Sequence, residues 1–318
     1  MTFIPAGVPA VVMVGTTPAG FFLQIRRRHM KTAVVTDSNS GIFEEEGRRL
    51  GVHVVPMPVM IEGQTYYEGR NLTHEAFYQM LSEHKEVSTS QPSPGDVMDV
   101  WEDLLLTGYE EIVYIPMSSG LSNSCQTAKM LAKEYGGKIH VVDNHRISVT
   151  QRHSVQDALS LAEKGYDAKA IKEILEKAAY ESIIYVGVET LEYLKKGGRV
   201  TPAGAAMGSL LNIKPLLIIE GERLDAFAKI RGTKNCKKRL LEEMKKSADK
   251  FHESGAEIRV GVAGSFVDSK QDQEWMDMAS EVFSGEEINY DPLTFSIGCH
   301  VGSGAFGMGI SKKITNDI

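Results

Sequence analysis

The sequence has few cysteines and no excess of positive charge. Among its 318 residues are three cysteines, Cys125, Cys236 and Cys299, which lie far apart in the chain. This spacing excludes a disulfide framework and a zinc site built from paired thiolates. The net charge of −7 argues against a nucleic-acid-binding surface. Few cysteines beside 14 methionines fit a reducing compartment, so we expect a cytoplasmic location.

Long apolar runs are also lacking. The longest stretch without a charged residue, residues 1–25, contains three prolines and three glycines, which argues against a membrane span. A signal peptide carries its positive charge before the apolar run, whereas Arg26, Arg27 and Arg28 follow it here. We therefore interpret residues 1–30 as a disordered or misassigned extension, and residues 31–316 as the folded part. We expect at most transient contact with membranes.

The remaining composition is that of an ordinary globular protein, with 42% hydrophobic and 24% charged residues. The length suffices for one large or two smaller domains. Apolar runs at residues 32–36, 112–115 and 138–143 alternate with helical patterns, which predicts a parallel sheet flanked by helices. After about residue 150, strands at 213–219 and 223–230 join through a short turn, which predicts a partly antiparallel second sheet.

The sequence also gives three more specific predictions for the first half of the chain. Ser40 is expected to cap a helix over residues 42–50. The extended run at residues 52–61 contains prolines, which favour an edge strand. Residues 87–92 are polar and are expected to form a loop.

Hydroxyl groups gather where the strand at residues 112–115 meets a helix predicted over residues 125–135. Ser118, Ser119, Ser122 and Ser124 stand in this turn. The N-terminus of a helix presents free N–H groups and a positive dipole end, so such a turn can bind a carboxylate or a phosphate. The alternative is that Ser122 only caps the helix.

Two further segments are ambiguous on their own. Residues 302–307 match G-x-G-x-x-G, but no strand–helix–strand unit follows, so a dinucleotide site is not expected. Residues 195–199, Lys-Lys-Gly-Gly-Arg, form either a solvated basic turn or a turn that brings Arg199 beside an anion. His300 stands among small residues, and a lone histidine is usually structural. We find neither a carboxylate pair with acid–base spacing nor a cluster with metal-ligand spacing.

Six short motifs in order over residues 31–314 together resemble the DegV family. They are Thr36-Asp37-Ser38, Thr89-Ser90-Gln91-Pro92-Ser93, Ser118-Ser119-Gly120-Leu121-Ser122, residues 191–200, Asn212-Ile213-Lys214-Pro215 and residues 300–305. The resemblance implies an α/β protein of two lobes that binds a long-chain, palmitate-like fatty acid and needs no cofactor or metal. The N-terminal lobe, about residues 31–150, would hold the mostly parallel sheet with its helices. The C-terminal lobe, about residues 151–316, would be α+β with the mixed sheet.

The resemblance also implies roles for individual residues. Thr89, Ser122 and His300 would hold the fatty acid carboxylate. Supporting positions would be Ser90, Ser119, Asn123 and Arg199. Some DegV proteins present the fatty acid to a separate kinase subunit, and Arg231 matches an arginine near the phosphate or the kinase in those members. The protein itself would not be an enzyme, and it would act in lipid transport or fatty acid metabolism.

Two positions depart from the usual family pattern. Asn123 stands where the family usually has glycine, which is expected to alter the geometry around the carboxylate. Residues 144–152 lack the Ser-Lys and glycine pair that usually follow Asp143, which is expected to alter the tunnel or the contact between the lobes.

A serine hydrolase or acyltransferase is the alternative function. Gly120-Leu121-Ser122-Asn123-Ser124 resembles a nucleophile elbow, G-x-S-x-G, but lacks the final glycine. In this hypothesis Ser122 is the nucleophile, His300 is the base, and Asp37 or Asp143 orients the base.

Overall fold

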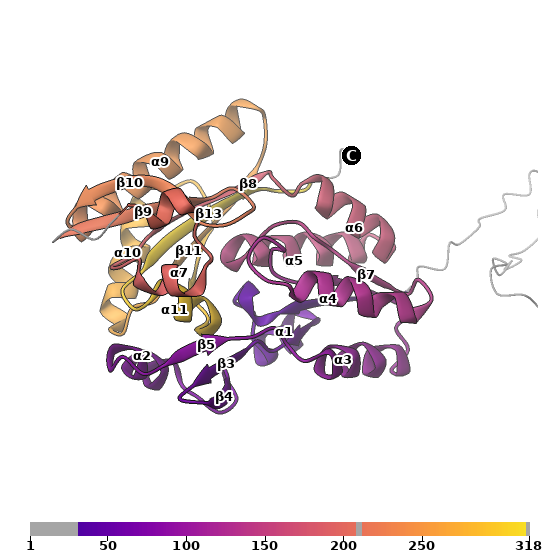
Figure 1. Ribbon diagram of the computed structural model, residues 1–318. Helices are drawn as coiled ribbons and strands as arrows, with labels where there is room; N and C mark the ends of the chain where they lie inside the picture. The colour runs from indigo at the N-terminus through magenta and orange to yellow at the C-terminus, as the bar shows by residue number, and fades with distance from the viewer. Residues whose placement is uncertain (1–30, 208–211, 316–318) are drawn as a thin grey trace, which may run out of the picture.

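The computed structural model describes residues 31–207 and 212–315, and its elements form two lobes that face each other (Figure 1). The expected extension at residues 1–30 lies outside the described residues, and so do the last residues of the predicted fold, from 316 on. Within the described ranges, no helix is both long enough and apolar enough to cross a membrane.

The first lobe contains a parallel sheet of four strands, as predicted. Their order is β2 (Val52–Val55), β1 (Thr32–Asp37), β6 (Glu111–Ile115) and β7 (Ile139–Val141). Helices α3 (Pro94–Leu106) and α4 (Ser124–Leu131) pack on one face of the sheet. Helices α5 (Ser148–Glu163) and α6 (Ala168–Lys177) pack on the other. All four strands are rich in Val and Ile because both faces are buried.

The second lobe contains a mixed sheet of six strands, again as predicted. The order is β10 (Asp225–Arg231), β9 (Ile213–Ile219), β8 (Ser182–Gly187), β13 (Phe306–Lys312), β11 (Ile258–Gly264) and β12 (Ile288–Pro292). Only the β11–β12 pair is parallel. Helices α9 (Thr233–Glu253) and α10 (Ser269–Val282) cover the outer face. The inner face is turned toward the first lobe and α5.

A small third sheet was not predicted from the sequence. It has the order β4 (Gln64–Tyr67), β3 (Pro58–Ile61) and β5 (Val87–Thr89). Helices α2 (His74–Ser82) and α11 (Phe295–Val301) pack together beside it through a cluster that includes Phe77, Tyr78 and Phe295. The remaining elements are short: η1 (Ser38–Ser40), α1 (Glu44–Leu50), η2 (Ala132–Tyr135), α7 (Glu192–Gly197) and α8 (Pro202–Ala205).

The structure corrects three of the expected boundaries. Ser40 lies in η1, and α1 begins only at Glu44 after Phe43, which forms no side-chain cap. The run at residues 52–61 divides into β2, which is an edge strand, and β3, which is the central strand of the small sheet. Pro58 is tolerated there because it is the first residue of β3 and pairs only with β4. Residues 87–89 of the expected loop form β5.

The helix predicted over residues 125–135 starts at Ser124, and its last turn is the 3-10 helix η2. Helix α5 contacts strands of both large sheets. The proposed lobe boundary near residue 150 falls at the start of this helix, and the division into lobes at that residue remains a proposal.

Candidate functional site

A cavity of about 360 Å³ lies between the inner face of the six-stranded sheet and the carboxyl ends of the parallel strands. This is the place where open α/β sheets bind ligands, and the volume lies within the usual ~300–1,000 Å³ of ligand pockets. Its apolar wall comes from both lobes and includes Ile147, Val149, Ile184, Val186, Ile219 and Leu224. The cavity can therefore remove an apolar group from water.

The three residues expected to hold a carboxylate all line this cavity. Thr89 is the last residue of β5, Ser122 lies in the loop before α4, and His300 lies in α11. Thr89 Oγ1 and His300 Nε2 are 3.0 Å apart, although the residues are 211 positions apart in sequence. The Ser122 hydroxyl accepts a hydrogen bond from the Ser124 N–H at 3.2 Å, so its proton is free to be donated.

The environment of His300 keeps its imidazole neutral. Burial, and then the nearby Arg199 charge, lower the pKa of His300 to about 4. Its Nδ1 is buried without a hydrogen-bond partner in the described part of the chain. A Cβ atom at Gly197 would overlap this ring, so the glycine allows α7 to pack directly against His300. The close packing against His300 explains why the first glycine of the Lys-Lys-Gly-Gly-Arg segment carries no side chain.

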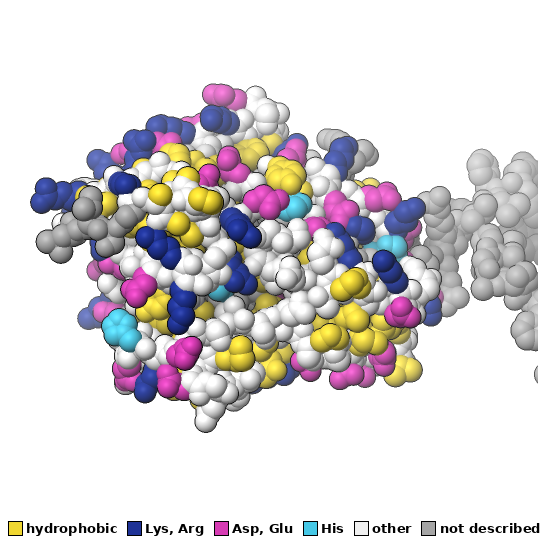
Figure 2. Space-filling model, in the orientation of Figure 1, with side chains coloured by type: hydrophobic (Ala, Val, Ile, Leu, Met, Phe, Trp, Pro, Cys, Tyr) yellow, Lys and Arg dark blue, Asp and Glu magenta, His cyan; other side chains and the backbone are white. Residues whose placement is uncertain are grey.

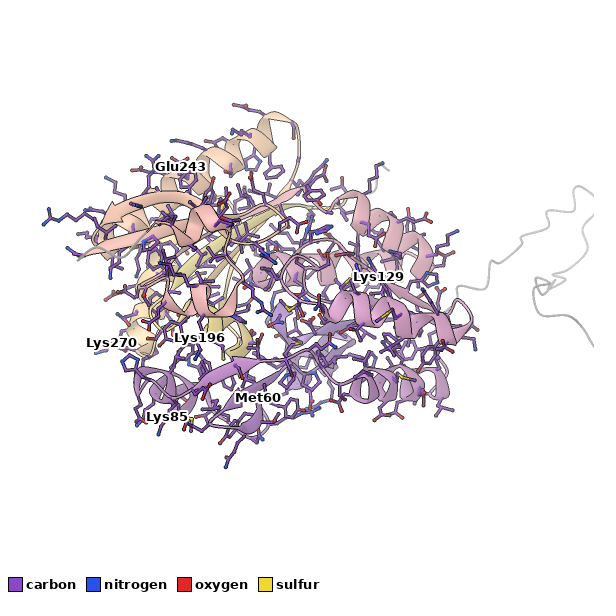
Figure 3. All side chains as sticks on the ribbon, in the orientation of Figure 1. Met60, Lys85, Lys129, Lys196, Glu243 and Lys270 are labelled. Carbon is purple, nitrogen blue, oxygen red and sulfur yellow. The ribbon has the colours of Figure 1, made fainter. Side chains whose placement is uncertain are left out.

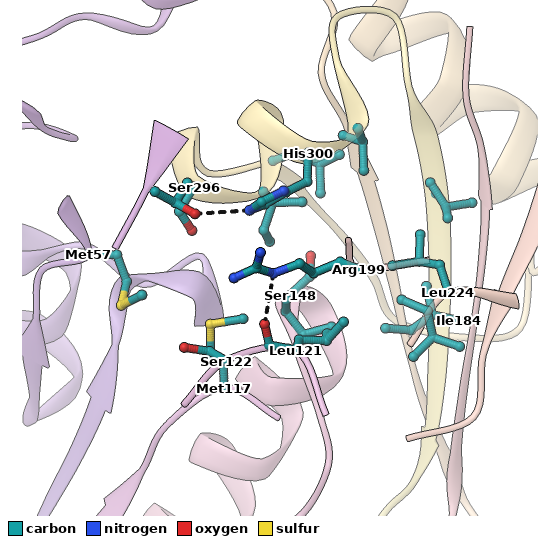
Figure 4. A pocket seen from close by; sticks show the side chains of 18 of the residues that line it. Met57, Met117, Leu121, Ser122, Ser148, Ile184, Arg199, Leu224, Ser296 and His300 are labelled. Atoms are coloured by element: carbon teal, nitrogen blue, oxygen red, sulfur yellow. Dashed lines mark hydrogen bonds between the residues drawn. The ribbon is translucent and has the colours of Figure 1, made fainter. Parts of the chain in front are cut away.

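Arg199 extends into the cavity between His300 on one side and Leu121 and Ser122 on the other (Figure 4). Its Nε donates to the Leu121 carbonyl at 3.2 Å, and its Nη1 donates to the Gly197 carbonyl. The guanidinium has further N–H groups that a ligand can use. It also places a positive charge near the hydroxyl groups of the cavity wall.

The other supporting residues fall into two groups. Ser90 and Asn123 also line the cavity. Asn123 precedes α4 and forms no side-chain cap there. Ser119 is not among the lining residues; it lies near Asp143, where Lys129 and then Ser119 help to lower the pKa of that carboxyl. Arg231 is exposed at the end of β10, away from the cavity lining, where Lys and Arg side chains gather near β9 and β10 (Figure 2).

The contacts of the described residues do not assemble a catalytic triad. His300 is paired with Thr89, and no hydrogen bond joins it to Ser122. Asp37 accepts from the Met117 and Asn39 N–H groups and from Gln151. Burial raises the pKa of Asp37 to about 6. Asp143 is paired with Lys129, which Figure 3 labels on α4, at 2.9 Å. Neither carboxylate is therefore in position to orient His300.

Sequence reasoning gave no role to four polar residues of the cavity wall: Gln91, Thr127, Ser148 and Ser296. Gln91 accepts from the Thr127 hydroxyl at 2.9 Å, which ties the loop after β5 to α4. Its place between Ser90 and Pro92 in the polar motif was an available signal. Ser296 lies on α11, which the sequence pattern did not reveal because glycines flank His300 on both sides. In the ranges that the structure describes, no group of three or more His, Cys, Asp or Glu side chains is placed to hold a metal ion.

Comparison with known proteins matches residues 31–313 to a family described as an uncharacterised protein of the DegV family. A DegV domain-containing protein of Listeria innocua is 31% identical over 285 residues, which cover 89% of this chain and 99% of that protein. Another, from Deinococcus radiodurans, is 34% identical over 218 residues, or 68% of this chain and 77% of that protein.

Solved structures show the same similarity. One is described as the fatty acid binding of a DegV family protein from Thermus thermophilus; its TM-score is 0.79 at 30% identity, with 89% of this chain and 100% of that chain covered. Another, DegV from Bacillus subtilis, described as a fatty acid binding protein, has a TM-score of 0.77 at 28% identity, with the same shares covered.

Proposed function

The chain belongs to the DegV family, and from this premise we propose that it binds one long-chain, palmitate-like fatty acid. The observation that supports this most directly is the cavity itself, which joins an apolar interior to a group of hydroxyls, a histidine and an arginine. The relatives from Thermus thermophilus and Bacillus subtilis are described as binding fatty acids. A carboxylate and an acyl chain match the two parts of this cavity.

In the proposed complex, Thr89 and Ser122 donate hydrogen bonds to the carboxylate. A neutral His300 that carries its proton on Nε2 donates to Thr89 Oγ1, which leaves the Thr89 proton free for the ligand. His300 thus orients Thr89, and Arg199 supplies the positive charge. A carboxylate placed here raises the pKa of His300 above its present value of about 4, because an opposite charge favours the protonated ring.

The acyl chain provides most of the driving force. Burial of ~0.8 kcal/mol per CH₂ over ~16 carbons gives a large apolar contribution, and ordering of the chain offsets much of it. The polar group therefore fixes the orientation of the ligand more than its affinity.

A kinase partnership is a finer proposal and rests on the resemblance to kinase-associated members. In it, this protein presents its fatty acid to a separate kinase subunit in the cytoplasm, Arg231 contacts that partner or the phosphate, and this chain performs no chemistry itself. The exposed position of Arg231 at the end of β10 is compatible with such a contact.

Native mass spectrometry tests the proposed ligand directly. Protein purified from cells without added lipid is expected to carry one extra mass in the range of a long-chain fatty acid. After delipidation it should take up one palmitate per chain. A ligand-free mass together with no palmitate uptake would contradict fatty acid binding.

A further inference from the structure

The turn between β9 and β10 docks onto the first lobe at the edge of the cavity. The carbonyl of Gly221 accepts a hydrogen bond from the Ser118 hydroxyl at 2.9 Å. Glu222 Oε1 lies 3.3 Å from His145 Nδ1. A Cβ atom at Gly120 would lie 3.0 Å from the Cα of Glu222, so the two backbones are in close contact. We call this contact between residues 220–222 and Ser118, Gly120 and His145 the clasp.

The clasp adjoins the wall of the cavity on both of its sides. In the second lobe, Ile219 and Leu224 flank the turn, and both line the cavity. In the first lobe, Leu121 follows Gly120 directly and Ile147 stands two residues after His145, and both line the cavity too. A separation of the clasp therefore moves four wall residues apart and opens the cavity along this edge.

The clasp consists of one buried hydrogen bond, from Ser118 to Gly221, and one polar contact at its rim, between His145 and Glu222. The Glu222 side chain is 61% exposed, and polar contacts in such positions contribute little to stability. By contrast, Arg152 on α5 is buried and bonded to Glu46 of the first lobe and Asp291 of the second. Asp157, one turn and a half further along α5, is fully buried and paired with Arg259. The lobes are thus fastened along α5 and only lightly joined at the clasp.

We propose that the clasp is the gate of the cavity, and that its opening, with the lobes still joined along α5, admits and releases the ligand. The identity of the ligand rests on the proposed function, but the gate is a separate claim. His145 stands in the segment, residues 144–152, where the chain departs from the usual DegV pattern. In this proposal the unusual residue serves the gate through its contact with Glu222.

A disulfide across the clasp tests the gate. In the double variant Gly120→Cys/Glu222→Cys the new Cβ atom at position 120 lies 3.0 Å from the Cα atom of residue 222, so a small shift of the turn brings the two thiols within reach of a disulfide. The native cysteines are buried. The protein is loaded with deuterated palmitate, and its replacement by unlabelled palmitate is followed by native mass spectrometry. The oxidised variant is expected to exchange at least tenfold more slowly than the same protein after reduction. The two single variants serve as controls and should show no effect of oxidation.

A second variant keeps the test decisive if the disulfide forms poorly. Ser118→Ala removes the hydrogen bond to Gly221. The rates of palmitate uptake and release should both rise severalfold and by about the same factor, so Kd should change little. Equal exchange rates in the oxidised and reduced double variant, or unchanged rates in Ser118→Ala, would overturn the gate. Failure of every variant and of the native chain to take up palmitate would instead contradict the proposed ligand.

Discussion

Ser122 has two possible roles, and they can be separated by experiment. Its oxygen accepts from the Ser124 N–H, which is a cap-like contact at the start of α4, and Ser122 also lines the cavity. Each hydrogen bond donated to a charged acceptor contributes ~1.5–3 kcal/mol. We therefore predict that Ser122→Ala weakens palmitate binding about tenfold or more, since ~1.4 kcal/mol is a factor of ten.

Hexadecanol provides the matched ligand for this prediction, because it has the same chain and no carboxylate charge. Titration calorimetry should show a smaller loss for hexadecanol than for palmitate. The melting temperature controls for the loss of the cap-like contact, which typically costs ~1 kcal/mol. Equal losses for both ligands would mean that Ser122 only supports its helix.

The individual site residues were predictable to different degrees. Ser122 lies in a polar motif that follows a parallel strand, so local pattern and the rule for parallel sheets bring it to the edge where ligands bind. Thr89 ends β5 of the small antiparallel sheet, which the sequence did not predict, so its role came from the resemblance. The resemblance supplied His300, since its local sequence resembles that of a structural histidine. The 3.0 Å contact between His300 and Thr89 depends on how α11 packs on the small sheet, and no spacing in the sequence reports it.

At the scale of elements, the start of α11 is held by a half-buried carboxyl group. Thr294 precedes this helix and forms no side-chain cap. Instead Glu68 Oε2 accepts from the Phe295 N–H at 2.9 Å. Burial raises the pKa of Glu68 to about 8, although the bond from Phe295 lowers it in part. Glu68 is therefore mostly protonated at neutral pH and acts as a neutral acceptor for the helix that carries His300.

This gives a prediction for Glu68→Gln, which imitates the protonated side chain. In the unfolded chain Glu68 ionises near pH 4.5, whereas in the folded chain it keeps its proton to about pH 8. The native protein therefore loses stability as pH rises through this window. The melting temperature of the variant relative to the native chain should rise by a few degrees between about pH 5 and pH 8.

Two control variants make the Glu68 prediction specific. Glu68→Ala should melt lower at every pH, because the Phe295 N–H loses its acceptor. Glu173→Gln makes the same substitution on α6 at a side chain that is 66% exposed, and serves as the matched control. A constant difference between Glu68→Gln and the native chain would show that the Glu68 carboxyl is ionised throughout.

The elements themselves were predictable where their pattern was long. The parallel strands were found because their apolar runs stand out between helical patterns. The small sheet was missed because β4 and β5 contain no apolar run, and because its strands pair in an order that the sequence does not follow. Helix α11 was missed for a similar reason, since its seven residues include a glycine and follow no repeating pattern.

At the scale of the whole molecule, the joint between the lobes depends on contacts that no local pattern contains. Arg152 Nη1 and Nη2 bond to the two oxygens of Glu46 at 2.7 and 2.9 Å, and its Nε lies 2.8 Å from Asp291 Oδ2. Asp291 stands in β12, far along the chain. The sequence showed only that residues 144–152 depart from the family pattern, and the structure places a buried cation there.

The last prediction concerns Arg152→Met, which leaves Asp291 buried without its cation. Burial already raises the pKa of Asp291 from 3.8 to about 6, although Arg152 lowers it in part. Because the folded value exceeds the unfolded one, the native chain loses stability as pH rises from about 4 to about 6. Without Arg152 the folded pKa of Asp291 rises further, so this loss continues to higher pH. We expect Arg152→Met to lose ~3–5 kcal/mol at about pH 8, and clearly less at about pH 5.5.

Urea unfolding at both pH values measures this difference, and two further variants isolate its cause. Lys312→Met removes one member of a half-exposed pair with Glu181, and should cost at most ~1 kcal/mol. Asp291→Asn added to Arg152→Met should restore part of the stability at about pH 8 and little at about pH 5.5, because the protonated carboxyl already resembles the amide. If Arg152→Met lost the same stability at both pH values, the cost would come from lost packing along α5, and the ion pairs would not be what holds the lobes together there.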